Sequence, residues 1–174
     1  YSDLGTDVVG ALVEKISGEP LHDFVKRELL DPLGMSSSLY GIDADDKRLS
    51  QAASAYLKVP AGWLPFWKGD SKPLYPFAWG SQTIYSTTTD YAKFLGMMMN
   101  GGRVGDRQVL SAAAVSRMLA PVSRAKMMQS DALMPTEFRN LEVYYGQMMV
   151  THRVIGKEKE KPVVIGHSGS VGTC

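Results

Sequence analysis

The sequence predicts an α+β fold, in which a mostly helical region, residues 1–140, precedes strands of an antiparallel sheet in residues 141–174. Before residue 121, apolar residues recur every three or four positions in several segments, which is the spacing of one face of a helix. Near Leu141 the pattern changes to alternation, which is typical of a half-buried strand. These two observations predict helices followed by an antiparallel hairpin between about Val143 and Gly169.

The first predicted helix begins after Asp3, and its apolar residues share one face. They are Leu4, Val8, Leu12 and Ile16, with Val9 and Val13 beside them. Ser2 or Asp3 can cap its start, and Gly18 can adopt the left-handed conformation that ends many helices. A second helix is predicted to open at Pro20 and to end before Asp31-Pro32. Its inward residues are Leu21, Phe24, Val25 and Leu29.

The clearest helix signal is the segment "STTTDYAKFLGMMMNGG". Thr87 or Thr88 can cap this third helix, Asp90 suits its first turn, and Gly101-Gly102 ends it. Its predicted inward face consists of Tyr91, Phe94, Leu95 and Met98. A run of methionines on an amphipathic helix fills core space far more often than it binds a metal or cofactor, so we interpret Met97–Met99 as core residues.

A fourth, shorter helix is predicted from a capping serine to a proline. Ser111 occupies the cap position, and Pro121 ends the helix because proline cannot continue it. The inward residues are expected to be Val115, Met118 and Leu119.

Between Ser36 and Gly80 the helical spacing is lost, and we expect a long irregular loop. This loop, residues 36–80, holds all three tryptophans, Trp63, Trp67 and Trp79, and several tyrosines and prolines. An aromatic-rich irregular segment is typical of a functional loop or pocket wall, since a simple linker is polar. A surface loop held by a few buried aromatic side chains explains the same composition.

The predicted hairpin has two apolar strands, "VYYGQMMVTHRV" and "PVVIGHSG". One side of the first strand is expected to carry Tyr144, Met148, Val150 and Val154. The charges between the strands, Lys157 to Lys161, nearly cancel, which favours a solvated turn over a binding patch.

Composition excludes several classes of function. A net charge of +1, from 19 basic and 18 acidic side chains, provides no field that would attract nucleic acid or an anionic membrane surface. No apolar run is long enough to span a bilayer. Cys174 is the only cysteine, so no internal disulfide can form. The three histidines lack the spacing of a helical metal site, and we expect no metal and no cofactor.

Two places could carry chemistry. His167 ends an apolar strand and precedes Ser168-Gly169-Ser170, small residues that let a ligand approach the backbone closely. His22 and His152 are more simply a surface histidine and a strand histidine. Tyr1 precedes a helix start, where a tyrosine is usually a packing residue; beside a cation it would become a proton shuttle.

Three motifs in order resemble the serine β-lactamase-like hydrolases, specifically the class C β-lactamase, esterase and penicillin-binding-protein-like branch. "YSDLGTDVVGALVEKISGEPLHDFVKRELLDPLGM" resembles that family's Tyr-x-Asn motif, its helix and a following turn. "GSQTIYSTTTDYAKFLGMMMNGG" resembles the segment often written Gly-Gly-x-x-Ser-Thr. "GHSGSVGT" resembles the strand motif that is Lys-Thr-Gly in β-lactamases and His-x-Gly in many esterases and peptidases.

The resemblance implies a nucleophile motif, Ser-x-x-Lys, upstream of the tyrosine motif. In this chain only Ser123 with Lys126 has that spacing, and it lies in the wrong order, so we interpret it as a chance match. We therefore expect residues 1–174 to be part of a β-lactamase-like domain that lacks its N-terminal and C-terminal parts. We also expect these residues alone to be inactive.

For the complete enzyme, the resemblance implies a serine that forms an acyl-enzyme, which water then hydrolyses. Tyr1 would relay the proton, and the Ser170 N–H would complete the oxyanion hole behind the wall formed by His167, Ser168 and Gly169. Trp79 would narrow the substrate mouth. The residues themselves leave the compartment open, and the resemblance suggests a bacterial periplasmic or secreted protein with any signal peptide upstream.

Two departures from the family pattern bear on substrate. Asp3 stands where asparagine is usual, and an ionised aspartate cannot donate to a substrate carbonyl. His167 replaces a lysine that would hold a carboxylate. Both argue against efficient hydrolysis of a penicillin or cephalosporin and for an ester or amide substrate. The expected partner is therefore a small-molecule ester, amide or peptide. The alternatives are a true β-lactamase or D-alanyl carboxypeptidase or aminopeptidase and, in another class, a sensor or pseudoenzyme that binds without turnover; the oligomeric state stays open.

Overall fold

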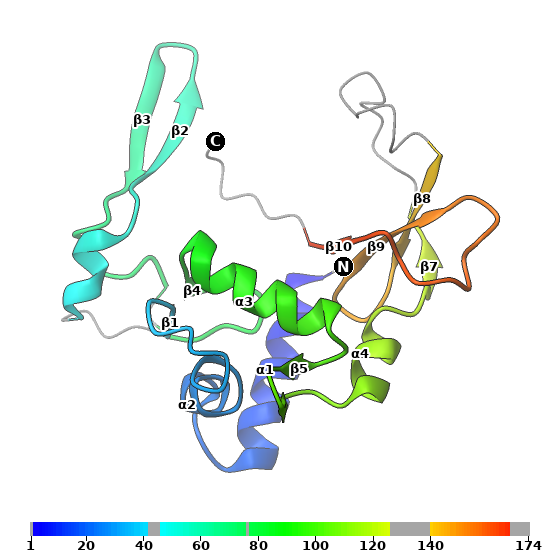
Figure 1. Cartoon of the computed structure of the whole chain (residues 1–174). Coiled ribbons are helices and arrows are strands. Elements are labelled where there is room, and N and C mark those ends of the chain that lie inside the picture. The colour runs from blue at the N-terminus through cyan, green and yellow to red at the C-terminus, as the bar shows by residue number, and fades with distance from the viewer. Residues whose placement is uncertain (1, 42–45, 76, 126–139, 168–174) are drawn as a thin grey trace. The chain divides into compact units, whose positions relative to one another are not determined.

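The computed structural model describes residues 2–41, 46–75, 77–125 and 140–167, and they form two compact units. Of these described residues, those between 2 and 100 and those between 104 and 109 belong to the first unit, and those between 101 and 103 and between 110 and 167 belong to the second. Helices and short strands make up the first unit, and an antiparallel sheet dominates the second (Figure 1). The predicted combination of helices with an antiparallel sheet is confirmed.

The helices of the first unit begin and end close to the predicted residues. Helix α1 spans Asp3–Ser17, with Ser2 as its cap and Gly18 in the left-handed conformation after it. Helix α3 spans Thr88–Met99 and is capped by the Thr87 side chain, which accepts a hydrogen bond from the Asp90 N–H. The second predicted helix is a short α-helix, α2 (Leu21–Val25), continued by a π-helical turn, η1 (Lys26–Leu30).

The core of the first unit is built from the second helical segment, the turn after it and α3. Its buried apolar side chains are Leu21, Leu30, Leu33, Met35, Leu39, Leu49, Met97 and Met98. Met97 and Met98 are each 1% exposed, so their interpretation as core residues is confirmed, whereas Met99 is exposed. The predicted inward face of α3 is shifted, because Tyr91 is exposed and Phe94 and Leu95 are only half-buried.

The expectation of an irregular loop over residues 36–80 is wrong in part. This segment contains a 3-10 turn, η2 (Lys47–Gln51), and an antiparallel hairpin of β2 (Ala55–Val59) and β3 (Gly62–Trp67). The hairpin escaped prediction because both of its faces carry apolar side chains, which removes the alternation that identifies a strand. The short strand β1 (Leu39–Tyr40) pairs with β4 (Ile84–Tyr85), which leads directly into α3.

The second unit holds the antiparallel sheet, with strand order β10-β9-β8-β7. The first predicted strand, "VYYGQMMVTHRV", is in fact two strands joined by a tight turn, because the Gly146 N–H donates to the Met149 carbonyl at 2.8 Å. Met148 therefore lies in the turn, with φ of +61°, and not on a strand face. The strands are β7 (Ser123–Arg124), β8 (Leu141–Tyr145), β9 (Val150–Val154) and β10 (Val164–Gly166).

A buried arginine connects the sheet to the end of the preceding helix and to the turn after β9. Arg153 on β9 donates to the Leu119 carbonyl, just after α4 (Ala112–Met118), and to the Glu158 and Glu160 carbonyls. It thereby holds the turn between β9 and β10, whose side chains are mostly exposed, as predicted for residues 157–161. The short strands β5 (Arg103–Val104) and β6 (Arg107–Gln108) pair with each other in a separate two-stranded sheet.

No helix among the described residues combines the length and the apolar character needed to cross a membrane. Over the same residues, no three or more histidine, cysteine, aspartate or glutamate side chains gather in a way that could hold a metal ion.

Candidate active site

The predicted site residues fall on both units. Asp3 and Trp79 belong to the first unit and His167 to the second. Tyr1, Ser168, Gly169 and Ser170 lie outside the described residues, as does Lys126, the partner of Ser123 in the chance motif.

The start of α1 is a capped helix end. The Ser2 hydroxyl accepts a hydrogen bond from the Gly5 N–H at 3.2 Å, and the Thr6 hydroxyl donates to the Ser2 carbonyl at 3.0 Å. Of the two candidate caps, Ser2 is therefore the one that acts, and Asp3 is the exposed first residue of the helix. An acidic residue there is also favoured by the partial positive charge of the helix N-terminus.

A loop, residues 79–83, is packed against the first two turns of α1. Gly80 is in such close contact that a Cβ built on it would lie 2.2 Å from the Thr6 carbonyl oxygen. Next to it, Asp7 accepts two hydrogen bonds from Ser81, at 2.9 Å from its N–H and at 2.7 Å from its hydroxyl. A carboxylate that accepts both donors of one residue fixes that residue's position and orientation.

Trp79 is held by its backbone, and its ring is left partly exposed. The Tyr40 hydroxyl donates to the Trp79 carbonyl at 2.6 Å, and the Trp79 N–H donates to the Thr83 hydroxyl at 3.1 Å. Thr83 has φ of +81°, which is rare for a β-branched residue. The Trp79 ring stacks on Phe77, with centroids 5.3 Å apart. The loop next to the start of α1 therefore presents two aromatic rings.

Tyr40 acts here as a hydrogen-bond donor and not as an acid or base. Burial, helped by the negative charges of Asp7 and Glu14, raises the pKa of Tyr40 to about 12. Its phenol therefore keeps its proton at neutral pH and goes on donating to the loop. Neither Asp7 nor Tyr40 was predicted as part of this region, because their partners are tens of residues away in the sequence.

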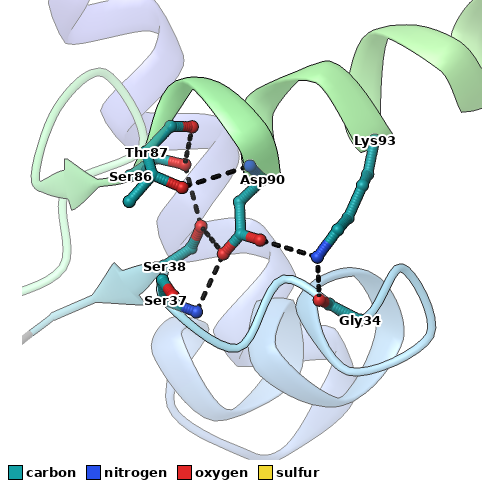
Figure 2. A network of polar contacts seen from close by, with 7 residues as sticks. All are labelled: Gly34, Ser37, Ser38, Ser86, Thr87, Asp90 and Lys93. Carbon is teal, nitrogen blue, oxygen red and sulfur yellow. Dashed lines mark hydrogen bonds and ion pairs between the residues drawn. The ribbon is translucent and has the colours of Figure 1, made fainter.

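A second polar network lies deeper in the first unit and ties the start of α3 to the turn after η1 (Figure 2). The Asp90 carboxylate accepts from the Ser37 N–H at 2.8 Å, from the Ser38 hydroxyl at 3.1 Å and from the Lys93 ammonium at 2.7 Å. The Ser38 and Ser86 hydroxyls lie 2.8 Å apart, and Lys93 also donates to the Gly34 carbonyl.

This network is structural in character. Asp90 is 3% exposed, and the hydrogen bond from Lys93, followed by those from Ser37 and Ser38, holds the pKa of its carboxyl below the usual range. The carboxylate thus stays ionised and shares its oxygens among fixed donors, so no hydroxyl of the network faces a free general base. The sequence placed Asp90 in the first turn of α3 but gave no sign that it would be buried.

On the second unit, His167 follows β10 directly and is exposed. Gly166 and Tyr145 both pair with Val150 from opposite sides of β9, which brings the Tyr145 ring toward His167. The Tyr145 hydroxyl lies 3.5 Å from His167 Nε2, and the two rings meet edge to face with centroids 6.2 Å apart. Burial raises the pKa of Tyr145, so its phenol is a proton donor at neutral pH.

The other two histidines lie where the sequence analysis expected them. His22 lies on α2, where its Nε2 is 3.6 Å from Asp23 Oδ1 and much of its side chain is in solvent. His152 lies on β9 and is half-buried, and this burial lowers its pKa. Its environment favours a neutral imidazole that packs within the sheet.

Comparison with known families shows the family of the chain. The family model described as "Beta-lactamase" matches residues 1–174, which is the whole chain. The chain belongs to the beta-lactamase family. The motif resemblance drawn from the sequence is thereby confirmed at family level.

Relatives of this beta-lactamase family chain include a protein named as a carboxypeptidase and two named as penicillin-binding proteins. A protein of Escherichia coli O157:H7, described as "Putative D-alanyl-D-alanine carboxypeptidase", is 29% identical over 129 residues. That match covers 66% of this chain and 30% of the relative. The octameric penicillin-binding protein homologue from Pyrococcus abyssi matches 99% of this chain and 33% of its own, with 25% identity and a TM-score of 0.71.

A penicillin-binding protein from Bacillus halodurans shares the fold, with a TM-score of 0.64 at 19% identity, over 90% of this chain and 41% of that one. The chain thus spans about a third of the length of these relatives.

Proposed function

We propose that this chain is part of a serine hydrolase that cleaves an ester or amide through an acyl-enzyme. The observation that carries the proposal is the match of the beta-lactamase family model to all of residues 1–174. It agrees with the three motifs, which occur in the family's order around Tyr1, Ser86 and His167.

In the proposed mechanism, a serine outside these residues attacks the substrate carbonyl. Tyr1, at the position of the motif tyrosine, passes the serine proton to the leaving group. Water then attacks the acyl group, and the proton of the water returns through Tyr1 to the serine oxygen. The Ser170 N–H contributes to the oxyanion hole, where one donor typically stabilises the transition state by about 3 kcal/mol. His167, Ser168 and Gly169 form the strand wall beside the acyl group.

Residues of the first unit support the proposed class of substrate. Trp79 and Phe77 present a stacked aromatic pair on a loop that Asp7 and Tyr40 hold against α1. Such a pair suits an apolar or aromatic acyl group. Asp3, exposed at the start of α1, replaces an amide donor with an acceptor, which favours a substrate with a donor at that position over a penicillin.

A second candidate is a D-alanyl carboxypeptidase. It is supported by the Escherichia coli relative, whose name states that activity and which is 29% identical to this chain. The two candidates share the acyl-enzyme and differ in the leaving group, which is an alcohol or amine in the first and D-alanine in the second.

The test uses a longer protein that contains this chain together with a Ser-x-x-Lys motif. It is assayed with p-nitrophenyl esters, a D-alanyl-D-alanine peptide and a chromogenic cephalosporin. We expect ester or peptide turnover and weak cephalosporin turnover, with Tyr1→Phe lowering kcat about a hundredfold or more at little changed KM. Binding without any turnover would overturn the proposal in favour of a sensor or pseudoenzyme.

The chain of 174 residues by itself provides the control. We expect no saturable turnover and no labelling by a serine-reactive phosphonate, since its serines lack an activating base in the family's order. Stoichiometric labelling of Ser123 would instead identify the Ser123–Lys126 pair as a working nucleophile.

A further inference from the structure

The hairpin formed by β2 and β3, residues 55–67, exposes large apolar side chains on both of its faces. Strand pairing places Leu57 opposite Leu64 on one face, which Phe66 shares, and Trp63 opposite Lys58 on the other, which Tyr56 shares. The exposed apolar residues are Tyr56, Leu57, Trp63, Leu64 and Phe66, each at least 37% exposed. A two-sided apolar surface of this kind is unusual in a water-exposed hairpin.

The base of the hairpin packs against its own unit. Farther out, β2 and β3 mainly contact each other. Trp67 packs on Tyr85 with ring centroids 5.6 Å apart, and its indole N–H donates to the Lys72 carbonyl at 2.8 Å. A Cβ built on Gly69 would lie 1.8 Å from the Ala52 carbonyl oxygen, so the chain closes tightly just beyond β3. The exposed residues therefore lie on a rigidly based projection, not on a loosely held loop.

We propose that this hairpin docks shallowly into the interfacial layer of a membrane that contains anionic lipid. A globular partner would cover one face and leave the other apolar face in water, whereas a lipid interface surrounds a projecting hairpin on both sides. Trp63 has the amphipathic ring that accumulates at the headgroup level of membranes.

The charges beside the hairpin fit the same occupant. Residues 55–72 contain three lysines and one aspartate, a net charge of +2, and all three lysines are exposed. The Lys58 ammonium lies 5.1 Å from the centroid of the Trp63 ring, so the cation accompanies the aromatic anchor. Because the whole chain carries only +1, apolar insertion supplies most of the expected binding, and anionic lipid adds a local contribution.

A second copy of the chain is the competing occupant, and the sequence of β3 disfavours it. Strand addition along the free edge of β3 needs backbone N–H groups, and Pro65 in the middle of β3 has none. Open strand edges also limit how deep the hairpin can go, because unpaired backbone groups are costly in hydrocarbon. The expected depth is therefore that of the headgroups and not of the bilayer centre.

The test uses a longer protein that contains this chain and measures its binding to vesicles of phosphatidylcholine with and without phosphatidylglycerol. We expect binding that is stronger with phosphatidylglycerol, and a Trp63→Ser/Leu64→Ser double variant that binds about a hundredfold more weakly, since each large apolar side chain contributes about tenfold or more. Trp63→Phe should keep most of the binding. Circular dichroism of each variant checks that the fold is kept.

The matched control is Leu12→Ser/Ile16→Ser on α1, which removes two side chains that are 52% and 83% exposed elsewhere in the same unit. It should leave vesicle binding unchanged. Equal loss in both double variants, or no binding by the unaltered longer protein, would overturn the proposal. Sedimentation velocity provides the last outcome: a dimer that the hairpin variant alone abolishes, without vesicle binding, would assign the surface to a second copy.

Discussion

Helices α1 and α3 carry similar apolar patterns, yet the structure uses their faces in opposite ways. On α3 the methionines at positions 97 and 98 are 1% exposed and form the centre of the core. On α1 the apolar residues at positions 4, 8, 12 and 16 are all more than half exposed, and the buried positions are the small residues Thr6 and Gly10.

The difference follows from what each helix packs against. An added Cβ on Gly10 would make close contact with both Leu21 and Gly80. Helix α1 therefore packs the side that carries its small residues against the 79–83 loop. Asp90 on α3 is buried because serine and lysine donors surround it. A helix that positions a loop by close backbone contact thus differs from one that fills a core, although both have an amphipathic sequence.

The sharpest test of this comparison removes one large side chain from each helix. Met97→Ala should lower the free energy of unfolding by about 3 kcal/mol, because it leaves a cavity in a closely packed core. Leu12→Ala should change it by less than about 0.5 kcal/mol, because the side chain is already in solvent. Urea unfolding followed by circular dichroism measures both. Similar losses would mean that the α1 face is covered in solution.

The next largest effect concerns the close approach of α1 to the loop. Gly80→Ala should destabilise the first unit by about 2 kcal/mol and displace Trp79, since the new methyl group would collide with the Thr6 carbonyl oxygen. Gly96→Ala on α3 is the matched control, because nothing lies within 4 Å of its added Cβ. It should stabilise the helix by about 0.5–1 kcal/mol. Opposite signs in thermal unfolding confirm the contrast, and a tolerant Gly80 contradicts it.

The buried carboxylate of α3 predicts a loss of stability in acid. Lys93 and the serine donors lower the folded-state pKa of Asp90, so its stabilisation is complete above the unfolded-state pKa, about 3.9. This stabilisation by Asp90 is lost as the pH falls through the lower pKa of the carboxyl in the folded state.

Asp90→Asn should therefore unfold at a lower temperature at pH 6 and lose less on acidification to pH 3 than the unaltered chain. Asp46→Asn, whose carboxylate is more exposed and pairs with Arg48, is the control and should show the same trend more weakly. Parallel pH profiles for Asp90→Asn and the unaltered chain would show that the Asp90 network does not titrate as a unit.

The smallest expected effect belongs to the sheet. The Tyr145 phenol can donate to His167 Nε2 only when the ring proton is on Nδ1, so this contact selects one tautomer of the imidazole. Tyr145→Phe should shift this tautomer balance, visible in the imidazole ¹⁵N chemical shifts, and change stability by less than about 0.5 kcal/mol. Tyr144→Phe, which instead loses a hydrogen bond to Glu142, should leave the His167 signals unchanged. Equal shifts in both variants would exclude a specific Tyr145–His167 contact.

The sequence by itself determined the helix ends and the fold class, because caps, left-handed glycines and changes of apolar period are local signals. Ser2, Gly18, Thr87 and Ser111 act as predicted at the ends of α1, α3 and α4. The motif order also determined the family. Local signals fail where a segment breaks its own period, as in the hairpin of β2 and β3.

Only the tertiary structure decided which faces are buried and which side chains hold the candidate site. Asp7 meets Ser81 across 74 positions, Asp90 meets Ser37 across 53, and Tyr145 meets His167 across 22. Each contact is between side chains or backbone groups that the fold brings together after long loops have closed, and no spacing in the sequence encodes such a meeting. Periodicity shows that a helix has an apolar face, but the neighbours that cover that face come from elsewhere in the chain or from outside it.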